Sequence, residues 1–463
     1  VDFTVDGDGV ARHEGRVMFV PGLAPGDAAE IEITADKKNY LLGKIKKIIE
    51  PSPDRIKPVC RHFGVCGGCS LQHYAYAAQL KWKEKFVEQS LRRLAGLNEL
   101  PLREIVPSAD IWAYRNKAQL PFGQGGAVGF FKMNSHSVVD LQECPIQHAD
   151  FLTIVESFRR FAREKKIPIY DEKTHRGILR HLVIRKSDYL KELLVGLVVN
   201  CREFGLRPEL KQLVETLNKK LQTYKIVSVV ANINQKKTNK ILAERIDNIL
   251  GSGFITEKIG GFLYKVSLNT FLQVNTPQAE KAYARIKEWC GSAVRLRSPT
   301  SPLDTQKPPN AERLVLNTAE GHRNILDAYC GIGTIALSVA DTAASVLGIE
   351  EVPQAVKDAK RNAENNGVAN VRFRQGQAEK QSIEALGAPE IIIVDPPRKG
   401  LAVEMTNKIL EIKPQKVIYL SCNPTSLARD LKLLSSLYKV REIIPYDFFP
   451  QTTHVETLVL LTL

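Results

Sequence analysis

The sequence predicts a multidomain α/β protein with a small N-terminal β-barrel of OB-like type, a central α+β domain and a C-terminal Rossmann-like domain. Three observations lead to this fold class. Short alternating strands fill residues 1–52, a group of spaced cysteines follows, and strands alternate with helices from residue 323 onward. A chain of 463 residues is also longer than one ordinary hydrophobic core.

The composition is that of a basic globular protein. Its formal net charge is +14, and 44% of its residues are hydrophobic. No apolar run approaches membrane-spanning length and no secretory signal is present, so we expect a cytoplasmic protein. The positive charge indicates a polyanionic partner such as nucleic acid. The alternative is a basic protein without such a partner, because net charge does not determine fold.

Residues 1–52 form the predicted barrel. Apolar residues at 17–20, 29–33 and 40–42 are separated by turns rich in Gly, Pro and Asp. Basic residues gather near the end of the segment, at Lys37, Lys38, Lys44, Lys46 and Lys47. A five-stranded barrel with a basic face is a common RNA-binding unit. Lysines that shield an exposed sheet edge are the alternative explanation.

Four cysteines predict a metal site in the second domain, residues 53–262. Three are spaced as C-x5-C-x2-C and the fourth is distant and followed by proline; they are Cys60, Cys66, Cys69 and Cys144. In a cytosolic protein this grouping indicates a metal site rather than disulfides. The spacing favours an iron–sulfur cluster. Zinc with four cysteine ligands is the alternative, although the paired C-x2-C knuckles usual for zinc are absent.

Two further segments belong with the third domain in this prediction. Residues 76–100 have helical periodicity with a polar face, and we expect this helix to pack on the third domain, residues 263–463. Residues 291–322 are rich in Ser, Pro, Thr, Gln and Arg, which predicts a flexible insertion within that domain.

The strand–helix alternation in the third domain predicts a doubly wound, mostly parallel sheet that binds ligands at the carboxyl ends of its strands. The predicted strands are 324–327, 345–350, 371–373, 391–395, 416–420 and 455–460. Three of them end in acidic motifs: Asp327-Ala-Tyr-Cys-Gly-Ile-Gly-Thr334, Glu350 and Asp395-Pro-Pro-Arg-Lys-Gly400. The glycine turn lacks the third glycine of a dinucleotide fingerprint and the lysine of a P-loop. Together, the three acidic motifs suit the binding of S-adenosylmethionine. Helix capping is the alternative explanation for any one of the three carboxylates, but it does not explain why all three lie at strand ends.

Cys422 is a candidate nucleophile at a strand-to-helix turn, where the positive end of the helix favours the thiolate. An inert buried thiol is the alternative. Alternation places His454 and Glu456 on one face of the last strand, near Cys422. Methylation of uracil at carbon 5 needs a thiolate that adds to carbon 6, a methyl donor, and a base that removes the carbon-5 proton. The sequence offers a candidate for each, although a salt-bridged strand residue would explain Glu456 equally well.

These motifs resemble the RNA uracil-5 methyltransferases nearly from end to end of the chain. The first domain resembles the family's TRAM domain, a β-barrel that binds RNA, and the four cysteines resemble the [4Fe-4S] cluster ligands of its ribosomal RNA members. The resemblance implies that Cys422 is the nucleophile and Glu456 the base. The S-adenosylmethionine pocket that it implies is lined by Gln273, Tyr329, Thr334, Glu350, Gln377 and Asp395.

The resemblance also implies a substrate. The family's transfer RNA member lacks the barrel and the cluster, so we expect a monomeric enzyme that acts on 23S ribosomal RNA. The alternatives are the same chemistry on transfer RNA, an amino-group methyltransferase, and a non-catalytic RNA-binding iron–sulfur protein. An amino-group methyltransferase would carry an aromatic residue where Arg398 stands, and it would leave Cys422 without a role. The cluster is expected to be structural or to position RNA, because uracil methylation transfers no net electrons.

Overall fold

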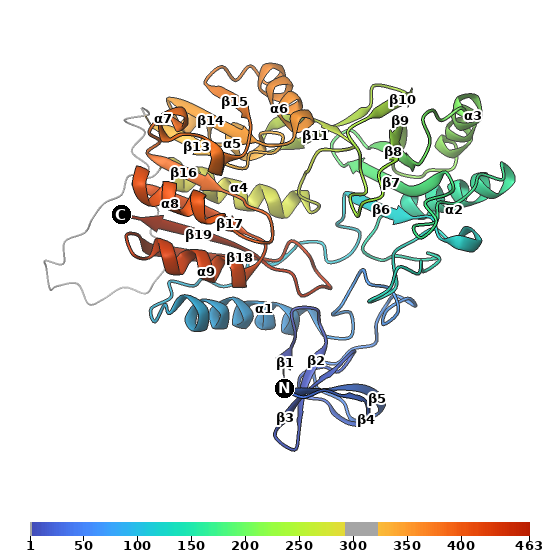
Figure 1. Ribbon diagram of the computed structural model, residues 1–463, viewed down its shortest axis with the longest axis horizontal. Coiled ribbons are helices and arrows are strands. Elements are labelled where there is room, and N and C mark those ends of the chain that lie inside the picture. The colour runs from blue at the N-terminus through green and yellow to red at the C-terminus, as the bar shows by residue number, and fades with distance from the viewer. Residues whose placement is uncertain (1, 292–322) are drawn as a thin grey trace, which may run out of the picture.

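The structure, a computed structural model, describes residues 2–291 and 323–463 (Figure 1). Within these ranges the strands form a five-stranded N-terminal sheet, a five-stranded central sheet, a two-stranded hairpin and a seven-stranded C-terminal sheet. Figure 1 shows the N-terminal sheet below the rest of the molecule, with the central and C-terminal sheets side by side above it. Among the described residues, no helix combines the length and apolar character needed to cross a membrane.

The N-terminal unit is all β, as predicted. Its strands are β1 (Asp2–Phe3), β2 (Gly9–His13), β3 (Arg16–Val20), β4 (Ala28–Asp36) and β5 (Tyr40–Glu50), in the order β1-β2-β3-β5-β4. Their alternating apolar residues build a small core around Met18, Val20, Leu23 and Leu41. This core is small for its surface, so contacts with the neighbouring helix contribute to holding the unit in place.

Helix α1 (Tyr76–Ser90) continues into a π-helical turn, η1 (Leu91–Ala95), and joins two parts of the molecule. Figure 1 shows it between the N-terminal sheet and the C-terminal domain. Val87 and Leu91 are fully buried in the core of the C-terminal domain, while the Trp82 ring lies 5.8 Å from the Phe3 ring of β1. The helix therefore packs on the third domain through one face and on the N-terminal unit through another.

The central domain is an α+β unit. Its strands are β6 (Lys117–Pro121), β7 (Leu179–Ser187), β8 (Glu192–Val199), β9 (Lys225–Ile233) and β10 (Ile246–Leu250), and its helices are α2 (Ala149–Glu164) and α3 (Arg207–Asn218). A short helical turn, η2 (Gln124–Gly126), follows β6. Apolar residues of both helices, such as Phe158 and Leu210, share one core with the sheet. The hairpin of β11 (Phe254–Ile259) and β12 (Phe262–Ser267) then leads the chain into the third domain, with which its core is continuous.

The C-terminal sheet confirms the doubly wound, mostly parallel prediction. Its strands are β13 (Asn324–Asp327), β14 (Ser345–Glu350), β15 (Val371–Gln375), β16 (Ile391–Val394), β17 (Lys416–Ser421), β18 (Lys439–Tyr446) and β19 (Glu456–Thr462), in the order β15-β14-β13-β16-β17-β19-β18. Strand β19 runs antiparallel to both neighbours. The sequence prediction lacked β18, which is an edge strand with charged residues and a proline and so lacks a simple apolar pattern.

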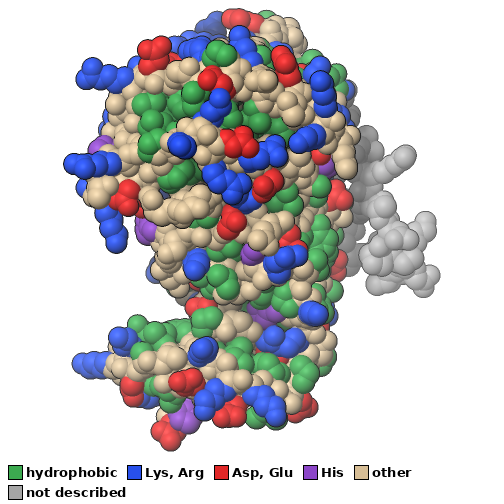
Figure 2. All heavy atoms as spheres, turned by 90° about the vertical axis from the view of Figure 1, so that its right-hand side faces the viewer, with side chains coloured by type: hydrophobic (Ala, Val, Ile, Leu, Met, Phe, Trp, Pro, Cys, Tyr) green, Lys and Arg blue, Asp and Glu red, His purple; other side chains and the backbone are tan. Residues whose placement is uncertain are grey.

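Helices cover this sheet. They are α4 (Thr276–Gly291), α5 (Thr334–Ser338), α6 (Pro353–Asn365), α7 (Ile383–Leu386), α8 (Val403–Ile412) and α9 (Pro424–Leu434), with two short turns, η3 (Ala340–Thr342) and η4 (Ala378–Lys380). The insertion predicted at 291–322 lies outside the described residues, except for Gly291, which ends α4. Figure 2 shows Lys and Arg side chains spread over the face that the central domain and the N-terminal unit present, with a constriction between the two.

Candidate active site

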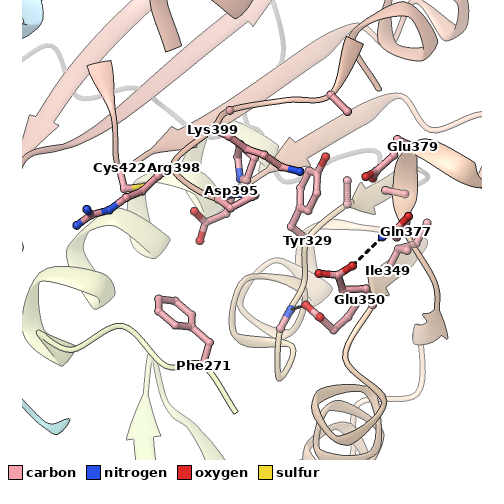
Figure 3. Close-up of a pocket in the computed structure, with 18 of the residues that line it drawn as sticks. Phe271, Tyr329, Ile349, Glu350, Gln377, Glu379, Asp395, Arg398, Lys399 and Cys422 are labelled. Carbon is pink, nitrogen blue, oxygen red and sulfur yellow. Dashed lines mark hydrogen bonds between the residues drawn. The ribbon is translucent and has the colours of Figure 1, made fainter. Parts of the chain in front are cut away.

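A cavity of about 550 Å³ opens at the carboxyl ends of β13, β14, β16 and β17. This is the place where open α/β sheets bind ligands, and the volume suits a cofactor-sized molecule. The loop after β12 contributes Phe271 and Gln273 to the lining, and Figure 3 shows Phe271 on the side opposite Asp395 and Lys399. Predicted site residues that line the cavity are Gln273, Tyr329, Glu350, Gln377, Asp395, Cys422 and Glu456.

Backbone donors fix the acidic end of the cavity. Gly331 adopts a φ of 54°, and its N–H donates to one carboxylate oxygen of Glu350 at 3.1 Å. The N–H of Val352 donates to the other oxygen at 2.7 Å. Each oxygen keeps a second lone pair for a ligand, so the carboxylate is both held and available. Beside it, the Gln377 amide donates to Glu351 at 2.9 Å.

Thr334 is placed differently from the prediction. It begins α5 outside the set of residues that line the cavity, with its hydroxyl 3.4 Å from the hydroxyl of Tyr283 on α4. Its carbonyl accepts a hydrogen bond from Tyr264 of β12 at 3.4 Å. The motif correctly locates the start of the helix, but the side chain turns toward α4 and away from the cavity.

Cys422 and Glu456 lie together at the other end of the cavity. Cys422 follows β17 and Glu456 begins β19, and these antiparallel strands pair in a register that sets Ser421 opposite Thr457. Glu456 is only 2% exposed, and burial, reinforced by the charge of Asp395, raises the pKa of its carboxyl well above the ordinary value. Burial also raises the pKa of Asp395 to about 7. These carboxyl groups can therefore hold protons near neutral pH.

The Cys422 thiol corrects one prediction. The sequence predicts a thiolate stabilised by the helix that follows, but the environment favours the neutral thiol. Burial, followed by the charges of Glu456 and Asp395, raises the pKa of the Cys422 thiol to about 12, although the charge of Arg398 opposes the shift. The amino end of α9 already has a partner, because the Asn423 side chain accepts from the N–H of Thr425 at 3.1 Å. The thiol is thus protonated at neutral pH in this state and needs a proton acceptor to react.

Several lining residues were not predicted as site residues. The Arg398 guanidinium donates to Nε2 of His454 at 3.0 Å, and burial together with the Arg398 charge lowers the pKa of His454 to about 4. Because the His454 ring is neutral, its Nε2 can accept the hydrogen bond that Arg398 donates. Phe271 is 63% exposed at the cavity mouth, and Figure 3 shows it across the cavity from Arg398 and Lys399. Arg398 stands in the Asp-Pro-Pro-Arg motif, which is the sequence signal that could have marked it.

The four spaced cysteines surround one small cavity that Cys60, Cys66, Cys69 and Cys144 line together. The Gly68 N–H lies 3.4 Å from the Cys66 sulfur, in the tight turn that the paired glycines allow. Across residues 2–291 and 323–463, however, no three His, Cys, Asp or Glu side chains are arranged to hold a metal ion. The structure brings the predicted ligands to one place, and the iron–sulfur site stays a prediction.

The fold and the site together indicate an enzyme that uses a nucleotide-like cofactor. They combine a Rossmann-like sheet, a cofactor-sized cavity at its strand ends, and a cysteine beside a buried carboxylate. The family model described as tRNA (uracil-5-)-methyltransferase matches residues 312–463, and the TRAM domain model matches residues 2–46. The chain belongs to the RNA (uracil-5-)-methyltransferase family, and it is an RNA methyltransferase.

Individual relatives agree with this assignment. An uncharacterised RNA methyltransferase of Halalkalibacterium halodurans is 38% identical, with 100% of this chain and 95% of the relative covered. One of Bacillus cereus is 36% identical with the same coverage. Among solved structures, the Pyrococcus abyssi tRNA (uracil-54, C5)-methyltransferase in complex with S-adenosyl-L-homocysteine matches with a TM-score of 0.75. It is 27% identical, with 100% of this chain and 98% of that one covered.

Proposed function

We propose that this enzyme transfers the methyl group of S-adenosylmethionine to carbon 5 of a uridine in RNA, through a covalent adduct between Cys422 and uracil carbon 6. The observation that carries the proposal is the meeting of Cys422, Glu456 and Asp395 at one end of a single cavity. Methylation of uracil at carbon 5 requires the enzyme to add a thiolate to carbon 6 and to remove the proton from carbon 5.

The residues at the other end of the cavity fit the methyl donor. Glu350 offers two fixed carboxylate oxygens, which suits the paired hydroxyls of a ribose, and the cavity volume of about 550 Å³ suits the whole molecule. Residues that would hold it are Gln273, Tyr329, Glu350, Gln377 and Asp395. When bound, S-adenosylmethionine supplies an electrophilic methyl group. The likeness to a solved enzyme that carries S-adenosyl-L-homocysteine supports the same assignment.

The protein's own groups then account for each proton. Cys422 loses its proton as its sulfur bonds to carbon 6, and the neighbouring carboxylate of Asp395 accepts that proton, so that Glu456 keeps its carboxylate for the later step. The uracil becomes an enolate, whose carbon 5 would take the methyl group that bound S-adenosylmethionine supplies, with S-adenosylhomocysteine as the leaving group. Glu456 then removes the carbon-5 proton, the electron pair re-forms the carbon 5–carbon 6 double bond, and the bond to the sulfur breaks. The positive charge of Arg398 favours the anionic forms of Cys422 and Glu456.

The RNA substrate is 23S ribosomal RNA in our proposal, with transfer RNA as the second candidate. The first choice follows from the resemblance of the barrel and cysteines to ribosomal RNA enzymes. One observation favours the second: the Pyrococcus abyssi transfer RNA enzyme matches over 100% of this chain, so a full-length match is not particular to ribosomal RNA enzymes. The cytoplasmic location, the monomeric state and the three domain boundaries stay predictions.

We also propose that Cys60, Cys66, Cys69 and Cys144 hold a [4Fe-4S] cluster, since all four line one cavity. Such a cluster would cross-link the segment before α1 to the one before α2, and it has no electron to supply to methylation. Iron and acid-labile sulfide should accompany protein purified without oxygen. Zinc in place of iron would show that the cluster assignment is wrong.

The function is tested by mapping 5-methyluridine in ribosomal and transfer RNA from cells that lack the enzyme. One uridine should lose its methyl group, regain it with the wild-type protein, and fail to regain it with Cys422→Ala. Restoration by Cys422→Ala would exclude the covalent mechanism. Loss of the modification from transfer RNA alone would select the second substrate.

A further inference from the structure

The segment between β18 and β19, residues 447–455, has no regular secondary structure, yet it brings Phe449 and His454 to the cavity and leads directly to Glu456. Its five consecutive carbonyls from Asp447 to Gln451 each accept a hydrogen bond from a distant part of the chain. In order, the donors are Gln278 (3.1 Å), Asn275 (3.2 Å), Lys83 (3.1 Å), Tyr114 (3.1 Å), and the backbone N–H groups of Ser70 and Leu71 (both 3.0 Å). We call residues 447–455 the anchored segment.

Gln451 is the most constrained residue of the anchored segment. Its φ is 69°, in the left-handed region that usually selects glycine, and its side chain is buried. The amide of Gln79 on α1 holds it from two directions. Gln79 Nε2 donates to Gln451 Oε1, and Gln79 Oε1 accepts from the Gln451 N–H, both at 3.1 Å. The strained backbone is therefore kept by contacts with a helix outside the Rossmann-like sheet.

Two other contacts fix the same segment. Lys83 of α1 donates to Asp447 at 2.6 Å, and both side chains are fully buried. A buried ion pair of this kind contributes more to fixing one arrangement of the chain than to the net stability of the fold. Ser70, which directly follows Cys69, accepts at its hydroxyl from the Thr453 N–H at 3.3 Å, while the Thr453 hydroxyl donates to the Val5 carbonyl. The N-terminal unit, the cysteine-bearing segment and α1 all meet the anchored segment.

We propose that Gln79, Tyr114 and Gln451 are positioning residues for methylation: they hold the anchored segment so that Glu456 stays beside Cys422. This inference rests on the proposed role of Glu456 as the base. It means that the catalytic geometry depends on α1 and on the segment around the cysteines, and not only on the sheet that carries the reacting groups.

The cleanest test is Tyr114→Phe, which removes one hydroxyl and its bond to the Pro450 carbonyl. The matched control is Tyr438→Phe, because the buried Tyr438 hydroxyl donates to the Pro414 carbonyl at 3.1 Å, away from the anchored segment. With S-adenosylmethionine and an in vitro transcript, we expect kcat of Tyr114→Phe to fall about tenfold and KM to stay within about twofold. Tyr438→Phe should keep its kcat, although both variants lose one buried hydroxyl that donates to a backbone carbonyl.

A second readout separates positioning from stability. A displaced Glu456 slows proton removal after the adduct has formed, so Tyr114→Phe should show more covalent protein–RNA adduct on denaturing gels than the wild type or Tyr438→Phe. Gln79→Leu should raise the adduct further, with Gln89→Leu on the same helix as its control, since Gln89 is only half-buried. If Gln79→Leu fails to fold, Tyr114→Phe alone decides the matter.

The outcomes distinguish this inference from the proposed function. A fall in kcat with adduct accumulation in Tyr114→Phe supports positioning. Equal kcat and equal adduct in the Tyr114→Phe and Tyr438→Phe enzymes would overturn it, provided that Glu456→Gln itself accumulates adduct. Absence of adduct in Glu456→Gln would instead remove the proposed role of Glu456, on which this inference depends.

Discussion

Ser421 of β17 lies directly opposite Thr457 of β19 in an antiparallel pair, and this register sets Cys422 and Glu456 at the same end of two adjacent strands. Successive side chains of a strand point to opposite faces, so a slip of one residue would turn Glu456 away from the cavity. Sheet pairing therefore sets which residues meet at this end of the two strands, and the anchored segment that precedes Glu456 holds it there.

The first prediction concerns Glu456. Glu456→Gln should still form the adduct, because Cys422 is intact, but it should not complete turnover, because an amide cannot accept the carbon-5 proton. We expect multiple-turnover methylation to fall by about 10²-fold or more, the usual range for loss of a positioned base. Denaturing gels of the enzyme with labelled transcript should show a slow-migrating covalent band.

Glu442→Gln is a suitable control for this experiment, since Glu442 lies on the neighbouring strand β18 and pairs with Arg103. It should methylate at the wild-type rate without an adduct band. A Glu456→Gln enzyme that turns over normally would show that another group removes the proton.

The second prediction concerns the Cys422 thiol, whose pKa of about 12 reflects burial and two neighbouring carboxyl groups. In the free enzyme, alkylation of Cys422 by iodoacetamide should quicken roughly tenfold per pH unit between about pH 7 and about pH 9, because the thiolate fraction rises in that proportion below the pKa. Peptide mass spectrometry separates Cys422 from the other cysteines. Arg398→Met should slow the reaction, since the charge of Arg398 lowers this pKa.

A rate that levels off near neutral pH would contradict this prediction. It would indicate a thiolate that is already formed, as the sequence pattern of a cysteine before a helix suggests. The comparison with Arg398→Met then tells whether that charge or the helix is responsible.

The third prediction concerns Asp327, whose pKa is raised to about 8 by burial and then by the charge of Asp395. The folded pKa lies above the unfolded value of about 4, so the folded state binds more protons between these limits. Stability should therefore fall as pH rises through this window. Compared with wild type, Asp327→Asn should gain free energy of unfolding on going from about pH 5 to about pH 9 in urea melts.

Asp110→Asn changes an exposed carboxylate and serves as the reference. Its difference from the wild type should be the same at both pH values. If the difference between Asp327→Asn and the wild type were also constant, the Asp327 carboxyl would not carry a raised pKa in the folded protein.

The sequence predicts the local elements well and the electrostatics poorly, for physical reasons. Buried parallel strands such as β16 are continuous apolar runs, so their positions follow from composition alone. The pKa of Cys422 depends on Glu456 and Asp395, which tertiary structure brings near, and a local helix-end argument gives the wrong direction. Likewise, the pair of Lys83 and Asp447 joins residues 364 positions apart, and no periodicity records such a contact.

The last prediction concerns the four cysteines. If they hold a cluster that cross-links the segments before α1 and α2, Cys66→Ser should lower the melting temperature of anaerobically purified protein and release iron. Because Ser70 directly follows Cys69 and anchors Gln451, the same variant should also lower kcat more than RNA affinity. The control is Cys201→Ser, a half-buried cysteine of the central domain outside the cavity that the four line. Loss of RNA binding at an unchanged melting temperature would instead assign the cysteines to RNA contact, and an unchanged iron content would remove Cys66 from the ligand set.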